Sequence, residues 1–253
     1  MKKIFSLVLV LILVCGMLVS CGDPVAMIAK ADAALEKAPY STTMKINFEA
    51  DNKELNDILS LMNMEIPMTV DGKNIAMNMS VDMMGYVIDA DMVVVDKVLY
   101  YDIGMIDDRV KIKAEMNEEQ YADFMKENNA QITVDPMDFS KLTVEDKDGK
   151  KYISGGEIGE DGLEKLNEMM ESSLEGIDGK ATVSNVTYGV TLDKKGRYEA
   201  IDMTCVYNIT AADITSEVTF NMVAEFSYDN VASVEIPADA DEYEEVSFDE
   251  LLS

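Results

Sequence analysis

The sequence contains no histidine and no tryptophan, and only three of its 253 residues are cysteine. Without histidine the chain cannot form the Ser–His or Cys–His pairs that activate a nucleophile, and it loses the commonest ligand of catalytic zinc. Carboxylates are plentiful, but no pattern in the sequence pairs two of them in a pocket. We therefore expect no catalytic residues, no cofactor and no metal site, and we expect that the protein is not an enzyme.

Basic side chains are also scarce. The chain has 21 lysines and arginines against 49 aspartates and glutamates, which gives a formal net charge of −28. Such a chain is repelled by nucleic acid and by anionic lipid surfaces, so we expect no nucleic-acid partner and no attachment to a membrane by charge alone. The same repulsion keeps copies of the protein apart, and we expect a monomer.

The N-terminal segment is the most specific signal in the sequence. Lys2 and Lys3 precede an apolar run over residues 4–14, which is too short for a mature spanning helix and typical of a secretory signal. Leu18-Val19-Ser20-Cys21-Gly22 follows and resembles the lipobox of bacterial lipoproteins. The resemblance implies a signal peptide over residues 1–20 and fatty acyl chains on Cys21. The mature protein would then be lipid-anchored at the extracytoplasmic face of the cell membrane.

Cysteine usage fits this view. If Cys21 is lipidated, Cys205 has no intramolecular partner, so no disulfide framework can hold the mature chain together. Burial must then stabilise the fold. Cys205 falls in the apolar phase of its segment, with Ile201, Met203 and Tyr207, and we expect a buried, slowly reacting thiol.

Two periodicities organise the rest of the chain. A helical spacing of apolar residues follows the Asp23-Pro24 start signal to about Lys37, and further helices are expected after Asn117 and over residues 163–174. A period of two, typical of strands, covers most of the remainder. The expected strands are 43–50, 75–83, 86–95, 98–103, 110–116, 142–145, 151–154, 181–193, 198–209, 214–228 and 231–236, whereas residues 54–70 fit no single pattern.

Short links between sequential strands favour an antiparallel sheet over βαβ units. We expect the α+β class, with a single large curved antiparallel sheet of about ten strands and two or three helices covering its packed face. Residues 21–237 form one domain in this view. An acidic tail over residues 238–253 follows Pro237, and we expect it to be loose.

The order of these elements carries a second resemblance. A lipobox, a short helix, a meander of strands, helices in mid-chain and the closing run Phe226-Ser227-Tyr228-Asp229-Asn230-Val231 before Ile236-Pro237 resemble half-barrel lipoproteins of the LolA type. This superfamily includes lipoprotein carriers and lipid-carrying lipoproteins. The resemblance implies an unclosed barrel with an apolar cavity under a helical lid, and of the functional residues it transfers only Cys21.

Methionine is unusually frequent in the segment Ile75-Ala76-Met77-Asn78-Met79-Ser80-Val81-Asp82-Met83. Two interpretations compete: a thioether set for copper(I), or a deformable apolar wall. The methionines alternate with other apolar residues instead of gathering beside polar partners, which favours the wall. The residues expected to line a ligand cavity are Met44, Ile46, Phe48, Met77, Met79, Val81, Met83, Phe220, Met222 and Phe226.

Three functions follow from these observations. The first is a membrane-anchored lipoprotein that binds a hydrophobic or amphipathic ligand, such as a lipid or lipopeptide, in a half-barrel cavity. The second is a protein-interaction module of the cell envelope with a filled core. The third is a copper(I)-handling lipoprotein.

Overall fold

The structure is a computed structural model, and it describes residues 23–83, 86–105, 108–130, 139–173, 180–211 and 214–251. The expected signal peptide over residues 1–20 and the expected lipid-attachment residue Cys21 lie outside the described residues. Both therefore stay predictions.

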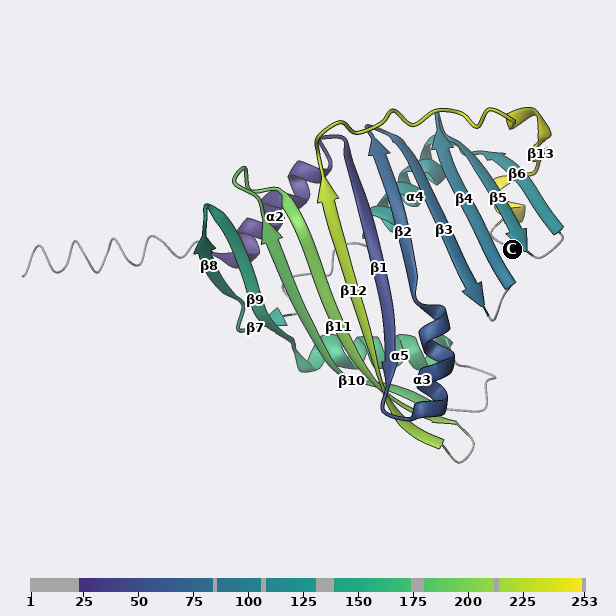
Figure 1. Ribbon diagram of the computed structural model, residues 1–253. Coiled ribbons are helices and arrows are strands. Elements are labelled where there is room, and N and C mark those ends of the chain that lie inside the picture. The colour runs from purple at the N-terminus through teal and green to yellow at the C-terminus, as the bar shows by residue number, and fades with distance from the viewer. Residues whose placement is uncertain are drawn as a thin grey trace, which may run out of the picture.

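One large, open and curved sheet dominates the fold (Figure 1). In the described part of the chain it has thirteen strands, in the order β13-β6-β5-β4-β3-β2-β1-β12-β11-β10-β9-β7, with β8 also paired to β9. The strands are β1 (Tyr40–Ala50), β2 (Met64–Asp71), β3 (Asn74–Met83), β4 (Tyr86–Val95), β5 (Val98–Met105), β6 (Asp108–Glu115), β7 (Phe139–Ser140), β8 (Thr143–Lys147), β9 (Lys150–Ile158), β10 (Lys180–Leu192), β11 (Tyr198–Ala211), β12 (Ile214–Ser227) and β13 (Glu244–Glu245).

The predicted fold class is confirmed. Among the described strands, all pairs are antiparallel except β13 with β6, which run parallel. The first strand, β1, pairs with the last long strand, β12, as well as with β2, so that β1 lies between them. This pairing joins the two halves of the chain in one sheet.

The helices are α2 (Pro24–Leu35), α3 (Lys53–Leu59), α4 (Glu118–Ala130), α5 (Glu160–Ser173) and α6 (Phe248–Leu251), with short 3-10 turns η1 (Ser60–Met62) and η3 (Ala240–Glu242). Figure 1 shows α2, α4 and α5 on one side of the sheet, and we call this side the inner face and the other the outer face. Within the described residues, no helix is both long and apolar enough to cross a membrane.

Local signals explain where these helices start. Asp23 caps α2 by accepting a hydrogen bond from the Val25 N–H at 3.0 Å, and proline follows at the first helical position. At α4, Asn117 accepts from the backbone of Gln120 while the Gln120 side chain accepts from the Asn117 N–H at 3.0 Å. This reciprocal pair is a capping box, and it marks the start of the helix expected after Asn117.

The C-terminal segment differs from expectation in two ways. Residues 231–236 form no strand but an irregular strap that crosses one end of the sheet (Figure 1). The acidic residues beyond Pro237 were expected to be loose, yet they form η3, β13 and α6, and Tyr243 and Phe248 each expose only 7 % of their surface. These two aromatic side chains dock the tail, because their burial outweighs the cost of ordering the polar residues around them.

Candidate functional site

The inner face is built from ranks of side chains that lie opposite one another on neighbouring strands. In one rank, Val70 pairs with Ile75, Ile75 with Val94, and Val94 with Leu99. We call this the capped rank, and its members are Tyr40, Val70, Ile75, Val94, Leu99 and Ala114. None of them exposes more than 5 % of its surface.

Helix α2 covers the inner face around β11 and β1. Ile28 and Ala31 of this helix are fully buried, at 0 % exposure, in the same core as Tyr198 and Tyr40. Tyr198 also donates its hydroxyl hydrogen to Asp32 Oδ1 at 2.6 Å. Burial raises the pKa of the Asp32 carboxyl above its ordinary value, while the hydrogen bond from Tyr198 opposes that shift. The polar contact therefore fixes the helix on a largely apolar surface.

Two further helices cover other parts of the inner face. The Tyr121 hydroxyl on α4 donates to the Lys73 carbonyl oxygen at 2.6 Å, which places α4 over the turn between β2 and β3. On α5, Asn167 exchanges hydrogen bonds with the backbone of Val183, at 2.7 Å and 3.2 Å. These contacts fasten α5 to β10. The cover is therefore concentrated at the β2–β3 turn and along β10 and β11.

Between these covered parts lies a patch of apolar side chains that stay half-buried. We call this patch the open stretch, and its members are Met44, Ile46, Phe48, Met64, Ile66, Met68, Met77, Met79 and Phe220. They come from β1, β2, β3 and β12, and strand register places them on the inner face together. The open stretch is the candidate ligand surface.

The sequence-predicted site residues whose side chains the structure describes all lie on the inner face. Ile46 lies opposite Met222, and Phe48 lies opposite Phe220 with their ring centroids 5.4 Å apart. Met77 and Met79 stand on the same face of β3, two strands away from β1. The rank that contains Phe226 crosses Thr42 on β1 before it reaches Met68 and Met77.

Not every predicted residue is open to a ligand. Val81, Met222 and Phe226 expose 8 %, 5 % and 9 % of their surface, so they act as core side chains behind the open stretch. Met83 ends β3, but its side chain lies outside the described residues. The half-buried part of the predicted set is Met44, Ile46, Phe48, Met77, Met79 and Phe220.

Sequence reasoning missed β2, which separates β1 from β3 and contributes Met64, Ile66 and Met68. The alternating pattern of a strand is present there, but Pro67 obscured it. Pro67 lies opposite Thr43 and points to the outer face, where its ring disturbs no inner-face packing. The period of two over residues 64–70 was the signal that could have identified this strand.

The chemistry of the open stretch is apolar. Thioether side chains have three rotatable bonds and a polarisable sulfur, so they repack around differently shaped molecules at low cost. Cys205, on the inner face of β11, is buried as predicted, with 5 % exposure, and burial raises the pKa of its thiol. It therefore supplies packing and no thiolate to this surface.

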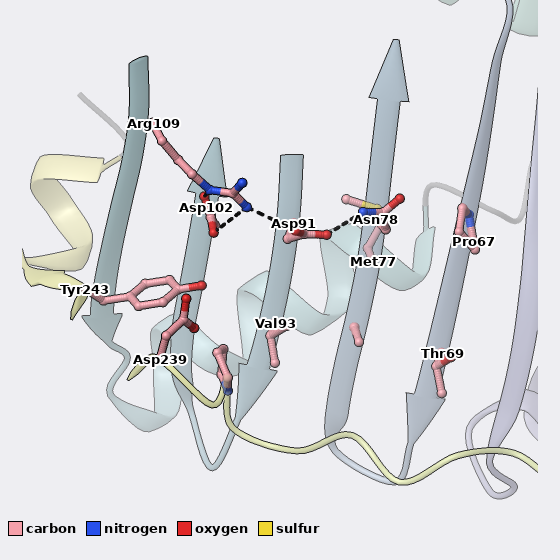
Figure 2. A pocket seen from close by; sticks show the side chains of 12 residues that line it. Pro67, Thr69, Met77, Asn78, Asp91, Val93, Asp102, Arg109, Asp239 and Tyr243 are labelled. Atoms are coloured by element: carbon pink, nitrogen blue, oxygen red, sulfur yellow. Dashed lines mark hydrogen bonds and ion pairs between the residues drawn. The ribbon is translucent and has the colours of Figure 1, made fainter. Parts of the chain in front are cut away.

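The outer face carries a groove of about 450 Å³ between β2–β6 and the C-terminal segment that follows the strap (Figure 2). Arg109 grips the buried carboxylate of Asp102 with two hydrogen bonds of 2.6 Å and 2.8 Å. Asn78 donates to Asp91 Oδ1 at 2.5 Å, and Arg109 approaches the same carboxylate at 3.9 Å. The polar groups of this groove are thus largely occupied with one another.

The C-terminal segment that follows the strap, residues 237–243, closes one side of this groove through ion pairs and an aromatic contact. Lys111 contacts Asp239 at 2.5 Å and Glu242 at 2.6 Å, and these hydrogen bonds raise the pKa of its ammonium group. Tyr243 stacks edge-on against Tyr100 with centroids 5.5 Å apart. The walls of the groove combine apolar side chains such as Val93 and Pro237 with paired charges, whereas the open stretch is lined by apolar side chains alone. The open stretch therefore suits an apolar ligand better.

No group of three or more histidine, cysteine, aspartate or glutamate side chains in the described ranges is placed to hold a metal ion. Methionines do gather, however. Met68 lies opposite Met77, and Met77 lies opposite Met92, so three thioether side chains stand in adjacent positions on one face. This row is the arrangement on which a soft-metal site would have to be built.

Comparison with known proteins gives a family and no activity. No curated protein matches the chain significantly. The model of a family of unknown function, DUF6612, matches residues 24–245, a segment that contains all the strands from β1 to β13. The chain therefore belongs to DUF6612, a family of unknown function.

Proposed function

We propose that this protein is a membrane-anchored, extracytoplasmic lipoprotein that binds a lipid or lipopeptide on the open stretch, without catalysis. The observation that carries the proposal is the contrast within one inner face. Side chains of the capped rank are sealed beneath helices, whereas apolar neighbours on the same strands, such as Met77 and Met79, stay half-buried. A continuous, partly exposed apolar surface inside a curved sheet is the usual form of a site for hydrophobic ligands.

The anchor in this proposal rests on the lipobox-like segment that ends at Cys21. Two acyl chains give stable membrane attachment, whereas one alone binds reversibly. The resemblance to LolA-type half-barrels supports the same assignment, since that superfamily combines an unclosed barrel with lipid-linked cargo. Acyl-chain mass spectrometry of the membrane-bound protein tests the anchor directly. An unmodified Cys21 in the mature membrane form would contradict it.

Binding would be driven by removal of apolar surface from water on both sides. Each acyl methylene that becomes buried contributes roughly 0.8 kcal/mol. The edge-on pair of Phe48 and Phe220 supplies the largest rings of the open stretch, and methionines surround it on β1, β2 and β3. Such a wall selects for apolar length more than for a particular head group.

A charge placed in the open stretch tests the binding surface. Met79→Asp would put a carboxylate on the inner face, where ligand binding would bury it without a partner. We expect lipid binding to fall at least tenfold, measured by native mass spectrometry of delipidated protein mixed with a membrane lipid extract. The matched control is Asn47→Asp, which adds the same charge on the exposed outer face of β1. Equal binding by both variants would contradict the proposal.

Asn78 is unsuitable as that control, although it also lies on the outer face. Its amide donates to Asp91 at 2.5 Å, so Asn78→Asp would bring two carboxylates into contact. Asn78→Asp would therefore destabilise the protein in addition to placing a charge on the outer face. Asn47 is exposed and lies opposite Asn221, which carries no charge.

A copper(I) role is the second candidate, and the row Met68–Met77–Met92 is the observation that favours it. Thioethers are soft ligands suited to copper(I). Titration of the delipidated protein with copper(I), against the variant Met77→Leu, separates the two candidates. Tight binding that the variant loses would favour the metal. If neither copper(I) nor lipid binds, the methionines serve packing alone, and the protein-interaction module becomes the better account.

A further inference from the structure

Charge is unevenly distributed over this acidic protein. The turns that join β8 to β9 and β10 to β11 form two hairpin tips, residues 145–151 and 193–199. Together the tips hold six basic and five acidic residues, whereas the whole chain has 21 basic and 49 acidic residues. The tips are therefore slightly basic on a molecule that is otherwise strongly negative.

The two tips lie side by side at one end of the sheet. Leu192 of β10 pairs with Lys151 of β9. The side chain of Lys194 lies against Gly149, where an added Cβ would be in van der Waals contact with the Lys194 Cε at 3.5 Å. Figure 1 shows both turns at the same end, next to α2. We call this region the hairpin end.

Half of the basic residues at the hairpin end are neutralised locally. Lys150 pairs with Glu199 at 2.5 Å, Arg197 pairs with Asp193 at 2.7 Å, and Lys151 pairs with Asp146. The other half is Lys147, Lys194 and Lys195. All three are exposed, and none takes part in the ion pairs found among the described residues. They are available to a negatively charged partner outside the molecule.

Helix α2 fixes the position of the N-terminal segment relative to this end. Its residue Asp32 is hydrogen-bonded to Tyr198, which is the first residue of β11 and lies within the second tip. The helix reaches β1 at its C-terminal side, so its N-terminal side extends across the sheet toward β10 and β9, as Figure 1 shows. Because Ile28 and Ala31 are fully buried, α2 is part of the rigid fold and not a tether.

The distance from the anchor to this helix is short. Pro24, the first residue of α2, follows Cys21 by three positions. Three residues span at most about 11 Å even when fully extended. A lipid on Cys21 would therefore hold the beginning of α2, and the hairpin end beside it, close to the membrane surface.

We infer that the hairpin end is a membrane-facing surface, on which Lys147, Lys194 and Lys195 contact the phosphates of anionic lipids. This inference rests on the proposed lipid anchor at Cys21. The acyl chains supply attachment, and the lysines orient the domain, since attraction acts within a Debye length of about 10 Å while the acidic remainder is repelled. The whole-chain charge still excludes attachment by charge alone.

The test uses full-length lipidated protein in vesicles of phosphatidylcholine and phosphatidylglycerol at a ratio of about three to one. Single fluorophores are placed by Asp148→Cys at the hairpin end and by Asp57→Cys on α3, at the opposite end of the sheet, with Cys205→Ala as background. Lipids carry a nitroxide in the head group. We expect quenching at residue 148 to exceed quenching at residue 57 at least threefold. Equal quenching at both positions overturns the inference.

Charge reversal then tests the lysines themselves. The triple variant Lys147→Glu, Lys194→Glu, Lys195→Glu should lose at least half of the quenching at residue 148 and remain in the vesicle fraction. The matched control reverses the charge of three exposed lysines at the opposite end of the sheet, Lys53, Lys165 and Lys180. This control should retain the quenching at residue 148. If both triple variants behave alike, the lysines do not orient the domain and the inference fails. If the full-length protein without charge reversals does not stay with the vesicles, the proposed lipid anchor is wrong, and the proposed function fails with it.

Discussion

The capped rank and the open stretch share the strands β1, β2 and β3 and the same face, yet they are built from different side chains. The capped rank contains Tyr, Val, Ile, Leu and Ala and no methionine, whereas five of the nine members of the open stretch are methionine. Branched side chains have few rotamers and fit a cover of fixed shape. Methionine adapts to a cover that changes. The composition of each region thus follows what lies over it, which for the open stretch is a variable ligand in our proposal.

The largest effect should come from removing packing in the capped rank. Leu99 exposes 4 % of its surface, so Leu99→Ala leaves a cavity that the neighbouring strands cannot close. We expect the free energy of unfolding to fall by about 2–5 kcal/mol. Met79→Ala, in the half-buried open stretch, should cost less than half as much. Urea unfolding of both variants measures this contrast, and equal losses would show that the two regions are packed alike.

The next effect concerns the polar contact beneath α2. The pKa of the Asp32 carboxyl in the folded state is raised above its ordinary value of 3.8, chiefly by burial. Since the unfolded chain ionises first as pH rises, this residue lowers stability as pH climbs from about 3.8 through the raised pKa. Asp32→Asn keeps the acceptor for Tyr198 and removes the charge. It should therefore match the original protein in Tm near pH 4 and exceed it by a few degrees at pH 7.

The control for this pH effect is Asp57→Asn, which removes an exposed carboxylate on α3. Its Tm should differ little from that of the original protein across the same range. A Tm advantage of Asp32→Asn that grew toward acid pH would contradict the sign derived from burial. Thermal melts followed by circular dichroism between pH 4 and pH 8 are sufficient for this test.

Much of this architecture could be predicted from local pattern. Along β3 the period of two assigned Met77 and Met79 to one face and Asn78 and Ser80 to the other, and the register confirms it. Strand order could not be predicted in the same way. Pairing of β1 with β12 joins segments that are far apart in sequence, and no local signal distinguishes β2 from β3 as the neighbour of β1.

The degree to which each side chain of one face is buried could not be predicted from the sequence either. Val81 and Met44 both fall in the inner-facing phase of their strands, but Val81 is buried and Met44 is half-buried. This difference depends on tertiary packing and not on the period of two. The prediction of a loose acidic tail was wrong for a related reason. Average composition after Pro237 indicates a loose segment, whereas two aromatic residues, Tyr243 and Phe248, pack against Tyr100 and Phe124 and order it.

A smaller effect on stability should accompany an exchange of composition between the two regions. The double variant Met77→Ile, Met79→Ile keeps apolar character but removes flexibility, so its free energy of unfolding should change by less than about 1.5 kcal/mol. The set of acyl-chain lengths that bind should nevertheless narrow, as measured by native mass spectrometry. The reciprocal control is Ile75→Met in the capped rank, which should leave that set unchanged. An unaltered set in the double variant would show that methionine flexibility does not serve binding.

The smallest effect is expected on the outer face of β1. Lys45 pairs with Glu225 across the strand boundary at 2.7 Å, but both side chains are substantially exposed, at 45 % and 58 %. Water and salt screen such a pair, and holding a long lysine side chain in one rotamer offsets much of the attraction. Lys45→Gln should therefore leave Tm unchanged within error, at low and at high salt. If Tm instead fell as far as in Leu99→Ala, the outer face of β1 would contribute as much to stability as the capped rank, and the contrast between a packed inner face and a solvated outer face would not hold.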